Sequence, residues 1–354
     1  MARAYRVERS YDWNYRQGPC LTRRAPSVPA TPLKDFLGYR VASRLGIAAG
    51  LLLNARWIRA YAARGYDILT YKTVRSAERV CYAPPNWVFL DPGIRVRPDE
   101  ARQRFATVAR PRAGAEFSSV SFGMPSKAPR VWMPDVARAR KGLGRGQVLV
   151  VSVVASPGAG ASAREIVGDF ADLAAMAREA GAHIVEANLS CPNVLTPEAQ
   201  IYQDADLSKA IGRAMTRAAP GLPVALKIGH LASGRPLDGL LRALAGEVRA
   251  VTMVNGFSRP VMGQGNRPAY GKGREAAGIL GANIFEPCAA MVESAMRTIR
   301  WEALGLEVIA VGGVFGEAQA ARYFRADAAA VTMGSAPMFD PNLAIRLKRA
   351  HPEW

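Results

Sequence analysis

From residue 45 onward, short apolar runs alternate with longer stretches in which apolar residues recur at helical spacing. The runs are continuous rather than alternating in polarity, as expected for parallel strands that are covered on both faces. We predict strands at residues 46–50, 67–72, 148–154, 184–190, 224–228, 250–255, 308–313 and 329–334. Helices are predicted between them. The clearest has a capping box at Ser162 and Glu165 and a terminal glycine, Gly181.

Eight strand–helix units in succession are typical of a closed (β/α)8 barrel, the TIM-barrel fold of the α/β class. In such barrels the functional site lies on the loops at the C-terminal ends of the strands. The alternative is an open, doubly wound sheet, but no GxGxxG motif follows the first predicted strand. We therefore expect a barrel whose chemistry comes from residues that follow the strands.

Three regions do not fit this repeat. Residues 1–40 form an N-terminal extension rich in Arg, Pro and Tyr, and the barrel is predicted over residues 41–345. Residues 73–146 and 256–307 are long insertions, each of which directly follows a predicted strand. Because loops at that end of a barrel build and cover its site, both insertions are expected over the C-terminal face.

Composition narrows the function classes. The 354 residues include four widely spaced cysteines without a CxxC pair, so neither a disulfide framework nor a metal or iron–sulfur centre is expected. The longest apolar run, VLVVSVVA from Val148, is far shorter than the roughly 20 residues that span a bilayer. The basic N-terminal residues do not show the apolar core of a signal peptide, and a cytoplasmic location is expected.

The formal net charge of +18 raises the question of a nucleic-acid partner. The Lys and Arg residues are dispersed among acidic ones, and neither a basic stripe with interleaved aromatics nor a nucleic-acid module is visible. An arginine-rich, solvated surface is the favoured interpretation. An anionic ligand or an acidic partner is the alternative, because a positive field also concentrates anions.

Two late strands end in glycine-containing turns, with Gly312 and Gly313 after the seventh and Gly334 and Ser335 after the eighth. In a barrel, the loops after strands seven and eight often bind a phosphate, because glycine lets backbone N–H groups approach the anion. Ordinary turn glycines would explain either motif alone. Their occurrence at this particular pair of strands favours a phosphate site.

Lysines and asparagines also follow the predicted strands. A lysine that points into a barrel mouth is costly unless it meets an anion or an electron-rich ligand, whereas a lysine at a strand end can also extend to solvent. An asparagine offers a donor and an acceptor together, which suits the edge of a cyclic amide, although each could also form a turn. The residues are Lys72, Lys227, Asn188, Asn193 and Asn255.

Cys191 lies between Asn188 and Asn193 in the stretch VEANLSCPNV. A lone cysteine is most often a small buried apolar residue. In a polar loop after a barrel strand, however, a thiol can act as a general base when its surroundings favour the thiolate.

VEANLSCPNV, together with GIAAG, YKTV, SFGMPS, VALKI, VNG, VGGV and MGSA in this order, resembles the dihydroorotate dehydrogenase family over roughly residues 45–340. The resemblance implies an FMN-dependent α/β-barrel oxidoreductase acting on CH–CH groups, in pyrimidine biosynthesis. Such an enzyme removes a proton from C5 of dihydroorotate and transfers a hydride from C6 to flavin N5. The cysteine in the loop resembles the soluble class of the family, which suggests a homodimer.

The resemblance also implies roles for individual residues. Cys191 would be the catalytic base, and Lys72 would contact both flavin and substrate in catalysis. The pyrimidine edges would be bound by Asn188, Asn193 and Asn255. The residues implied at the flavin are Ala48, Ala49, Gly50, Lys72, Thr73, Ser152, Asn188, Lys227 and Asn255, with Gly278, Gly312, Gly313, Gly334 and Ser335 at its phosphate.

Some positions depart from the family pattern. Residues 50–54 read GLLLN where the family usually has GLDKN. Val120 stands where an asparagine usually precedes the SFGMPS segment, Ser126 ends that segment, and Gly256 replaces a hydroxyl residue after Asn255. Each lost polar contact to a substrate costs about 1–3 kcal/mol of recognition. The flavin residues match the family while the substrate residues are altered.

Two alternatives follow. One is an enzyme similar to dihydropyrimidine dehydrogenase, or a biosynthetic flavoprotein, that acts on another cyclic amide or on a C=C bond conjugated to a carbonyl. The other is a non-catalytic flavin-binding barrel or a nucleic-acid-associated barrel, which the charge of +18 would support. The electron acceptor is left open by the sequence.

Overall fold

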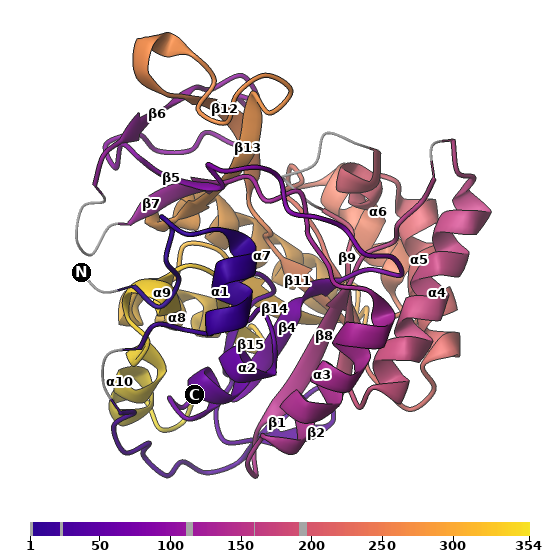
Figure 1. The fold of residues 1–354 in the computed structure, drawn as a ribbon. Helices are drawn as coiled ribbons and strands as arrows, with labels where there is room; N and C mark the ends of the chain where they lie inside the picture. Colours follow the sequence, from indigo (N-terminus) through magenta and orange to yellow (C-terminus); the bar gives the residue numbers. More distant parts are fainter. Residues whose placement is uncertain (1–2, 22–23, 111–115, 159, 191–196) are drawn as a thin grey trace.

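The computed structural model describes residues 3–21, 24–110, 116–158, 160–190 and 197–354. In this part of the chain, eight parallel strands close into a barrel (Figure 1). Going round the barrel, they are β3 (Leu45–Ile47), β4 (Ile68–Val74), β8 (Val148–Val153), β9 (Ile184–Asn188), β10 (Val224–Lys227), β11 (Ala250–Met253), β14 (Glu307–Val311) and β15 (Ala330–Met333). The predicted (β/α)8 fold is therefore confirmed.

Helices follow the strands and cover the outside of the barrel (Figure 1). They are α2 (Ala55–Ala62), α3 (Pro129–Lys141), α4 (Ala163–Glu179), α5 (Ala205–Ala218), α6 (Arg235–Leu244), α7 (Phe285–Trp301), α8 (Glu317–Arg325), α9 (Ala336–Phe339) and α10 (Leu343–Ala350). The capping box predicted for α4 is present, and Gly181 beyond its end has a φ of 97°. Across the described segments, none of the helices combines the length and the apolar character that crossing a bilayer requires.

The two insertions meet and form a second, smaller barrel. Its strands are β5 (Trp87–Leu90), β6 (Phe105–Val108), β7 (Phe117–Val120), β12 (Phe257–Met262) and β13 (Ala276–Gly281). β12 pairs with β6 and β13 pairs with β7, which joins the two insertions directly. Since they leave the main barrel at the C-terminal ends of β4 and β11, the small barrel stands over that face (Figure 1).

The opposite end of the main barrel is closed by a hairpin formed by β1 (Lys34–Phe36) and β2 (Tyr39–Val41). Phe36, Leu37 and Val41 pack against side chains in the barrel interior, among them Ile68 and Ile184. Side chains therefore fill the barrel at its N-terminal end. The division of the chain into an extension, residues 1–40, and a barrel, residues 41–345, stays a prediction.

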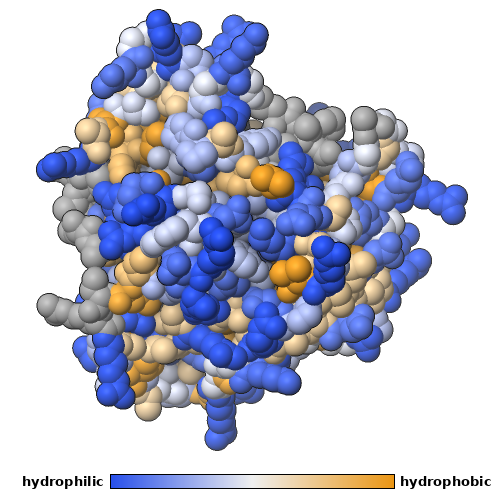
Figure 2. Space-filling model, viewed as in Figure 1, coloured by the Kyte–Doolittle hydropathy of each residue, from blue (hydrophilic) through white to orange (hydrophobic). Residues whose placement is uncertain are grey.

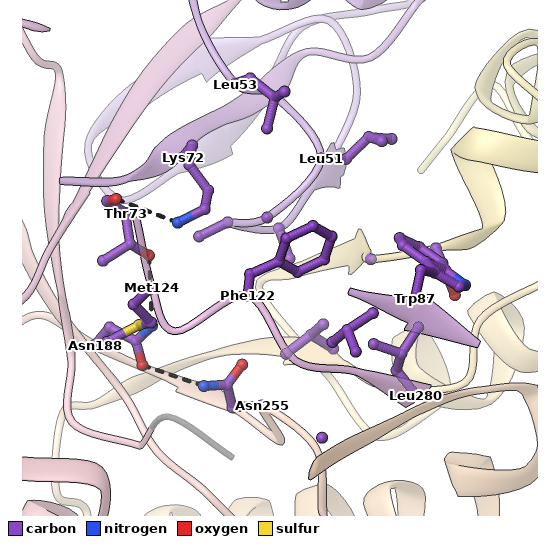
Figure 3. A pocket seen from close by; sticks show the side chains of 18 of the residues that line it. Leu51, Leu53, Lys72, Thr73, Trp87, Phe122, Met124, Asn188, Asn255 and Leu280 are labelled. Carbon is purple, nitrogen blue, oxygen red and sulfur yellow. Dashed lines mark hydrogen bonds between the residues drawn. The ribbon is translucent and has the colours of Figure 1, made fainter. Parts of the chain in front are cut away.

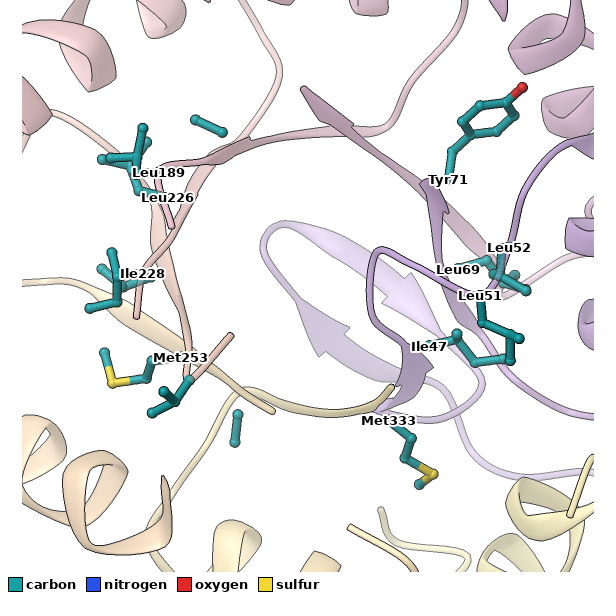
Figure 4. Packing of buried hydrophobic residues seen from close by; sticks show 14 of the residues in the cluster. Ile47, Leu51, Leu52, Leu69, Tyr71, Leu189, Leu226, Ile228, Met253 and Met333 are labelled. Atoms are coloured by element: carbon teal, nitrogen blue, oxygen red, sulfur yellow. The ribbon is translucent and has the colours of Figure 1, made fainter. Parts of the chain in front are cut away.

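A larger apolar layer lies between the strands and the surrounding helices (Figure 4). Leu69, Leu226 and Met253 are fully buried there, while neighbouring residues of the same strands, such as Ile68 and Ala225, face the interior. Burial on both faces explains why the strands read as continuous apolar runs.

Hydrophilic side chains cover most of the face shown in Figure 2. Several surface arginines pair with carboxylates of neighbouring elements, as Arg213 does with Glu247 and Arg242 with Glu302. These exposed pairs contribute little stability individually. They show that part of the large arginine content is used on the surface of the helical layer.

Candidate active site

A pocket of about 1060 Å3, counting the part open to solvent, lies at the C-terminal mouth of the barrel. This is the size range of ligand and cofactor sites, roughly 300–1000 Å3. The barrel, the small barrel and the N-terminal extension all contribute to its walls. The predicted site residues that line it are Ala48, Ala49, Gly50, Lys72, Thr73, Asn188, Lys227, Asn255, Gly278, Gly334 and Ser335.

Three predicted residues lie behind this lining. The Ser152 hydroxyl forms a 3.0 Å hydrogen bond with the hydroxyl of Thr73, and it is Thr73 that lines the pocket. A Cβ atom at Gly312 would lie 2.5 Å from the Cys288 sulfur, and one at Gly313 would lie 2.5 Å from Phe285 Cα. These two glycines thus allow α7 to pack closely on the end of β14, and their phosphate role stays a prediction. Cys191 and Asn193 lie outside the described residues.

An amide network forms the polar side of the pocket (Figure 3). Asn188 Oδ1 accepts hydrogen bonds from Asn255 Nδ2 at 3.1 Å and from the Ser190 N–H at 3.3 Å. Asn188 Nδ2 donates to Thr73 Oγ1 at 3.4 Å, and Asn255 Nδ2 also donates to Ser190 Oγ at 3.2 Å. Each amide is therefore oriented by its neighbours at the ends of β9 and β11.

The two predicted lysines occupy different depths. Lys72, half-buried on β4, donates from Nζ to the carbonyl oxygens of Thr73 and Pro125, each at 3.4 Å. Lys227, the last residue of β10, is only 2 % exposed. An ammonium group at that depth is costly unless it faces an electron-rich or anionic partner. Both lysines are among the pocket residues, where such a ligand can reach them.

The other side of the pocket is aromatic and apolar, and sequence reasoning missed it. Tyr5 and Tyr11, from the N-terminal extension, line the pocket. Trp87 and Phe122 also line it (Figure 3). Tyr5 lies 6.0 Å from the rings of both Trp87 and Phe122, measured between centroids. Burial raises the pKa of Tyr11 well above its ordinary value, so its hydroxyl stays neutral. The signal in the sequence that could have indicated this aromatic wall is the presence of tyrosines in the basic, proline-rich N-terminal extension.

The departures from the family pattern fall in and around the same pocket. Leu53 and Val120 line it, whereas Leu52 is fully buried in the core. Ser126 has a structural contact, because its hydroxyl accepts a hydrogen bond from the backbone N–H of Arg75 at 3.0 Å. Gly256 immediately precedes β12. Its φ of 137° is a backbone conformation that favours glycine. Of the altered positions, Leu53 and Val120 thus face the pocket itself.

Two glycines leave backbone open to a ligand. A Cβ atom added at Gly50 or at Gly334 would meet no other atom within 4 Å. Open backbone, a buried lysine and paired amides face an aromatic wall across one pocket. This donor set fits a flavin, whose ring system has a polar pyrimidine edge and an apolar benzenoid end. The fold and the pocket are those expected of the class of flavin-binding α/β-barrel oxidoreductases.

Comparison with known proteins narrows this class. The family model "Dihydroorotate dehydrogenase" matches residues 123–350, and the chain belongs to this family of oxidoreductases acting on CH–CH groups. The chain is 29% identical to the dihydroorotate dehydrogenase of Dictyostelium discoideum, over 97% of its own length and 95% of the relative's. It is 28% identical to a putative dihydroorotate dehydrogenase A (fumarate) of Aeropyrum pernix, over 52% of its length and 56% of the relative's.

A solved structure supports the fold independently. The crystal structure of DHODH from Eimeria tenella in complex with ferulenol superimposes with a TM-score of 0.71, covering 96% of this chain and 89% of that one. The sequence identity is 15%. At this identity the similarity shows the shared barrel architecture and leaves the ligand to be argued from the site itself.

Proposed function

We propose that the protein oxidises dihydroorotate to orotate with FMN as its prosthetic group. The observation that carries the proposal is the meeting of Lys72, Asn188 and Asn255 on one side of a pocket with open backbone at Gly50 and Gly334. A cyclic amide needs paired donors and acceptors, and a flavin needs close main-chain approach. Both needs are met within a single cavity.

The residues that would hold FMN come from the ends of three barrel strands, β3, β10 and β15, and from the second insertion. Lys227 would face the polar edge of the ring system, and Gly334 and Ser335 would lie at the phosphate, where β15 passes into α9. Ala48, Ala49 and Gly50 would line the ring, and Gly278 would lie towards the phosphate. When bound, FMN accepts the hydride that leaves C6 of the substrate.

The chain's own groups would bind, orient and deprotonate the substrate. The Asn188 and Asn255 amides, already oriented by one another, would hold the ring edge, while the Lys72 ammonium would neutralise carboxylate or carbonyl charge. Cys191, as a thiolate, would take the proton from C5 while the C5=C6 double bond forms. The aromatic wall with Trp87 and Phe122 would exclude water.

Resemblance to the soluble, cysteine-base class of the family supports a cytoplasmic homodimer, which belongs to the same proposal. The acceptor that reoxidises the protein is a separate question. The relative from Aeropyrum pernix is named for fumarate, which makes fumarate the first acceptor to assay.

Turnover with an artificial dye acceptor tests the substrate. We expect orotate from dihydroorotate and much slower reaction with dihydrouracil or dihydrothymine. Asn255→Ala should lower kcat/KM at least about ten-fold, since a lost hydrogen bond to a buried amide costs about 1–3 kcal/mol. Asn283→Ala is the matched control, because the Asn283 amide donates hydrogen bonds to the carbonyls of Pro92 and Ile94 in the first insertion.

Two outcomes would overturn the proposal. Faster turnover of dihydrouracil than of dihydroorotate would indicate an enzyme similar to dihydropyrimidine dehydrogenase. A colourless protein that retains RNA through purification would indicate the nucleic-acid-associated alternative.

A further inference from the structure

Arg75 is a buried arginine three positions after Lys72, just beyond the end of β4, and only 4 % of it is exposed. Its Nε donates to the carbonyl of Met124 at 3.2 Å and its Nη1 to that of Ala155 at 2.7 Å. Its own carbonyl accepts a hydrogen bond from Trp132 Nε1 at 3.1 Å. One residue thus joins a pocket loop, the end of β8 and helix α3.

The loop in question spans residues 121–126, and two of its side chains, Phe122 and Met124, line the pocket (Figure 3). Met124 has a φ of 52°, in the left-handed region that residues with a Cβ adopt only when their surroundings impose it. The Met124 carbonyl, which Arg75 holds, belongs to this strained residue. The two ends of the loop are held by other residues, the first by hydrogen bonds of Asn86 and Tyr82 to Ser121 and Phe122 and the last by a backbone bridge from Arg79 to Ser126, whereas Arg75 holds its middle at Met124.

The loop in turn touches the polar side of the pocket. Met124 Sδ lies 3.7 Å from Asn188 Nδ2, and the Pro125 carbonyl accepts a hydrogen bond from Lys72 Nζ at 3.4 Å. A displacement of the loop would therefore change the surroundings of both an amide and an ammonium group of the proposed substrate site.

The chemistry at this position requires an arginine. A planar guanidinium can reach two carbonyl oxygens in fixed directions, whereas a lysine offers a single ammonium on a flexible stem. An apolar side chain of similar volume would fill the space but leave the buried carbonyls of Met124 and Ala155 without these donors.

We infer that Arg75 is a positioning residue that fixes the loop of residues 121–126, and through it Lys72 and Asn188, in the geometry that binds the substrate. The inference rests on the proposed function for the identity of the substrate. The part concerning the loop itself stands on the contacts of Arg75 alone.

The test compares Arg75→Met and Arg75→Lys with Arg259→Met in the flavin-containing protein. Arg259 is a matched control because it is 6 % exposed and also donates to backbone carbonyls, those of Arg97, Pro98 and Ser258, away from the pocket lining. Two quantities are measured: hydrogen exchange of the peptide covering residues 121–126, and the Kd of orotate from the change in flavin absorbance.

Arg75→Met should speed exchange in this peptide and raise the orotate Kd about ten-fold or more. Arg75→Lys should give smaller changes in the same direction, and it decides the question if Arg75→Met does not fold. Arg259→Met should leave both quantities near wild type even if its Tm falls.

Unchanged exchange in the Arg75 variants, or equal effects of Arg259→Met on both quantities, would overturn the inference. A wild-type protein that shows no response to orotate would instead refute the proposed substrate. In that case the exchange measurement still decides the role of Arg75.

Discussion

At the scale of single residues, buried polar groups determine how the protein responds to its surroundings. His183 precedes β9, and its Nδ1 accepts a hydrogen bond from the Leu149 N–H at 2.8 Å. Burial, with a smaller contribution from the nearby Arg140 charge, lowers the pKa of His183 to about 4. The folded protein therefore keeps this ring neutral where the unfolded chain, with a pKa near 6.5, binds a proton.

This difference predicts a loss of stability in acid. Between pH of about 6.5 and about 4 the unfolded state binds the extra proton, so the free energy of unfolding falls as the pH is lowered through that window. His183→Asn, which retains a hydrogen-bond acceptor, should make the free energy of unfolding less dependent on pH in this window. Urea midpoints at pH 7, 5.5 and 4.5 measure it.

His351→Asn is the control for the opposite sign. The hydrogen bond that His351 Nε2 donates to the Glu317 carboxylate raises the pKa of His351, so the stability it adds is present at low pH and lost as the pH rises. Replacing His351 should therefore not reduce the loss of stability in acid. An equally steep loss in wild type and in His183→Asn would contradict the assignment.

The sequence was most informative about residues at strand ends. Lys72, Asn188 and Asn255 could be predicted because the C-terminal ends of parallel strands meet at one mouth. Tyr5 and Arg75 could not, because their pocket contacts are with residues far away along the chain: Tyr5 packs on Trp87, and Arg75 holds Met124. Periodicity does not encode contacts of that kind.

At the scale of elements, local sequence motifs such as the capping box predicted the helices in which they occur. In α4 the Ser162 hydroxyl accepts a hydrogen bond from the Glu165 N–H at 3.3 Å, and the Glu165 carboxylate accepts one from the Ser162 N–H at 2.7 Å. The small barrel was not predicted, because its strands are short and pair across two insertions that lie far apart in the sequence.

Ser162→Ala tests the cap of α4. Loss of the side-chain acceptor should lower the free energy of unfolding by about 1 kcal/mol without changing flavin content. Ser27→Ala, at an exposed position in the irregular segment before β1, is the control and should have almost no effect. Denaturant midpoints measure both variants, and equal midpoints for the two would show that the cap does not stabilise the helix.

At the scale of the whole molecule, three parts of the chain share one cavity. The main barrel supplies the amides and lysines, the small barrel supplies Trp87 and Leu280, and the N-terminal extension supplies Tyr5 and Tyr11. The positions that depart from the family pattern, Leu53 and Val120, also line this cavity. These two side chains therefore face the cavity in which the substrate is proposed to bind.

Anaerobic titration of the purified protein with dihydroorotate, followed by its visible absorbance, tests this arrangement most directly. If substrate and flavin share the pocket as proposed, one equivalent of dihydroorotate should bleach the flavin and yield one equivalent of orotate. A flavin that stays oxidised at saturating dihydroorotate, yet is reduced at once by dithionite, would contradict the account.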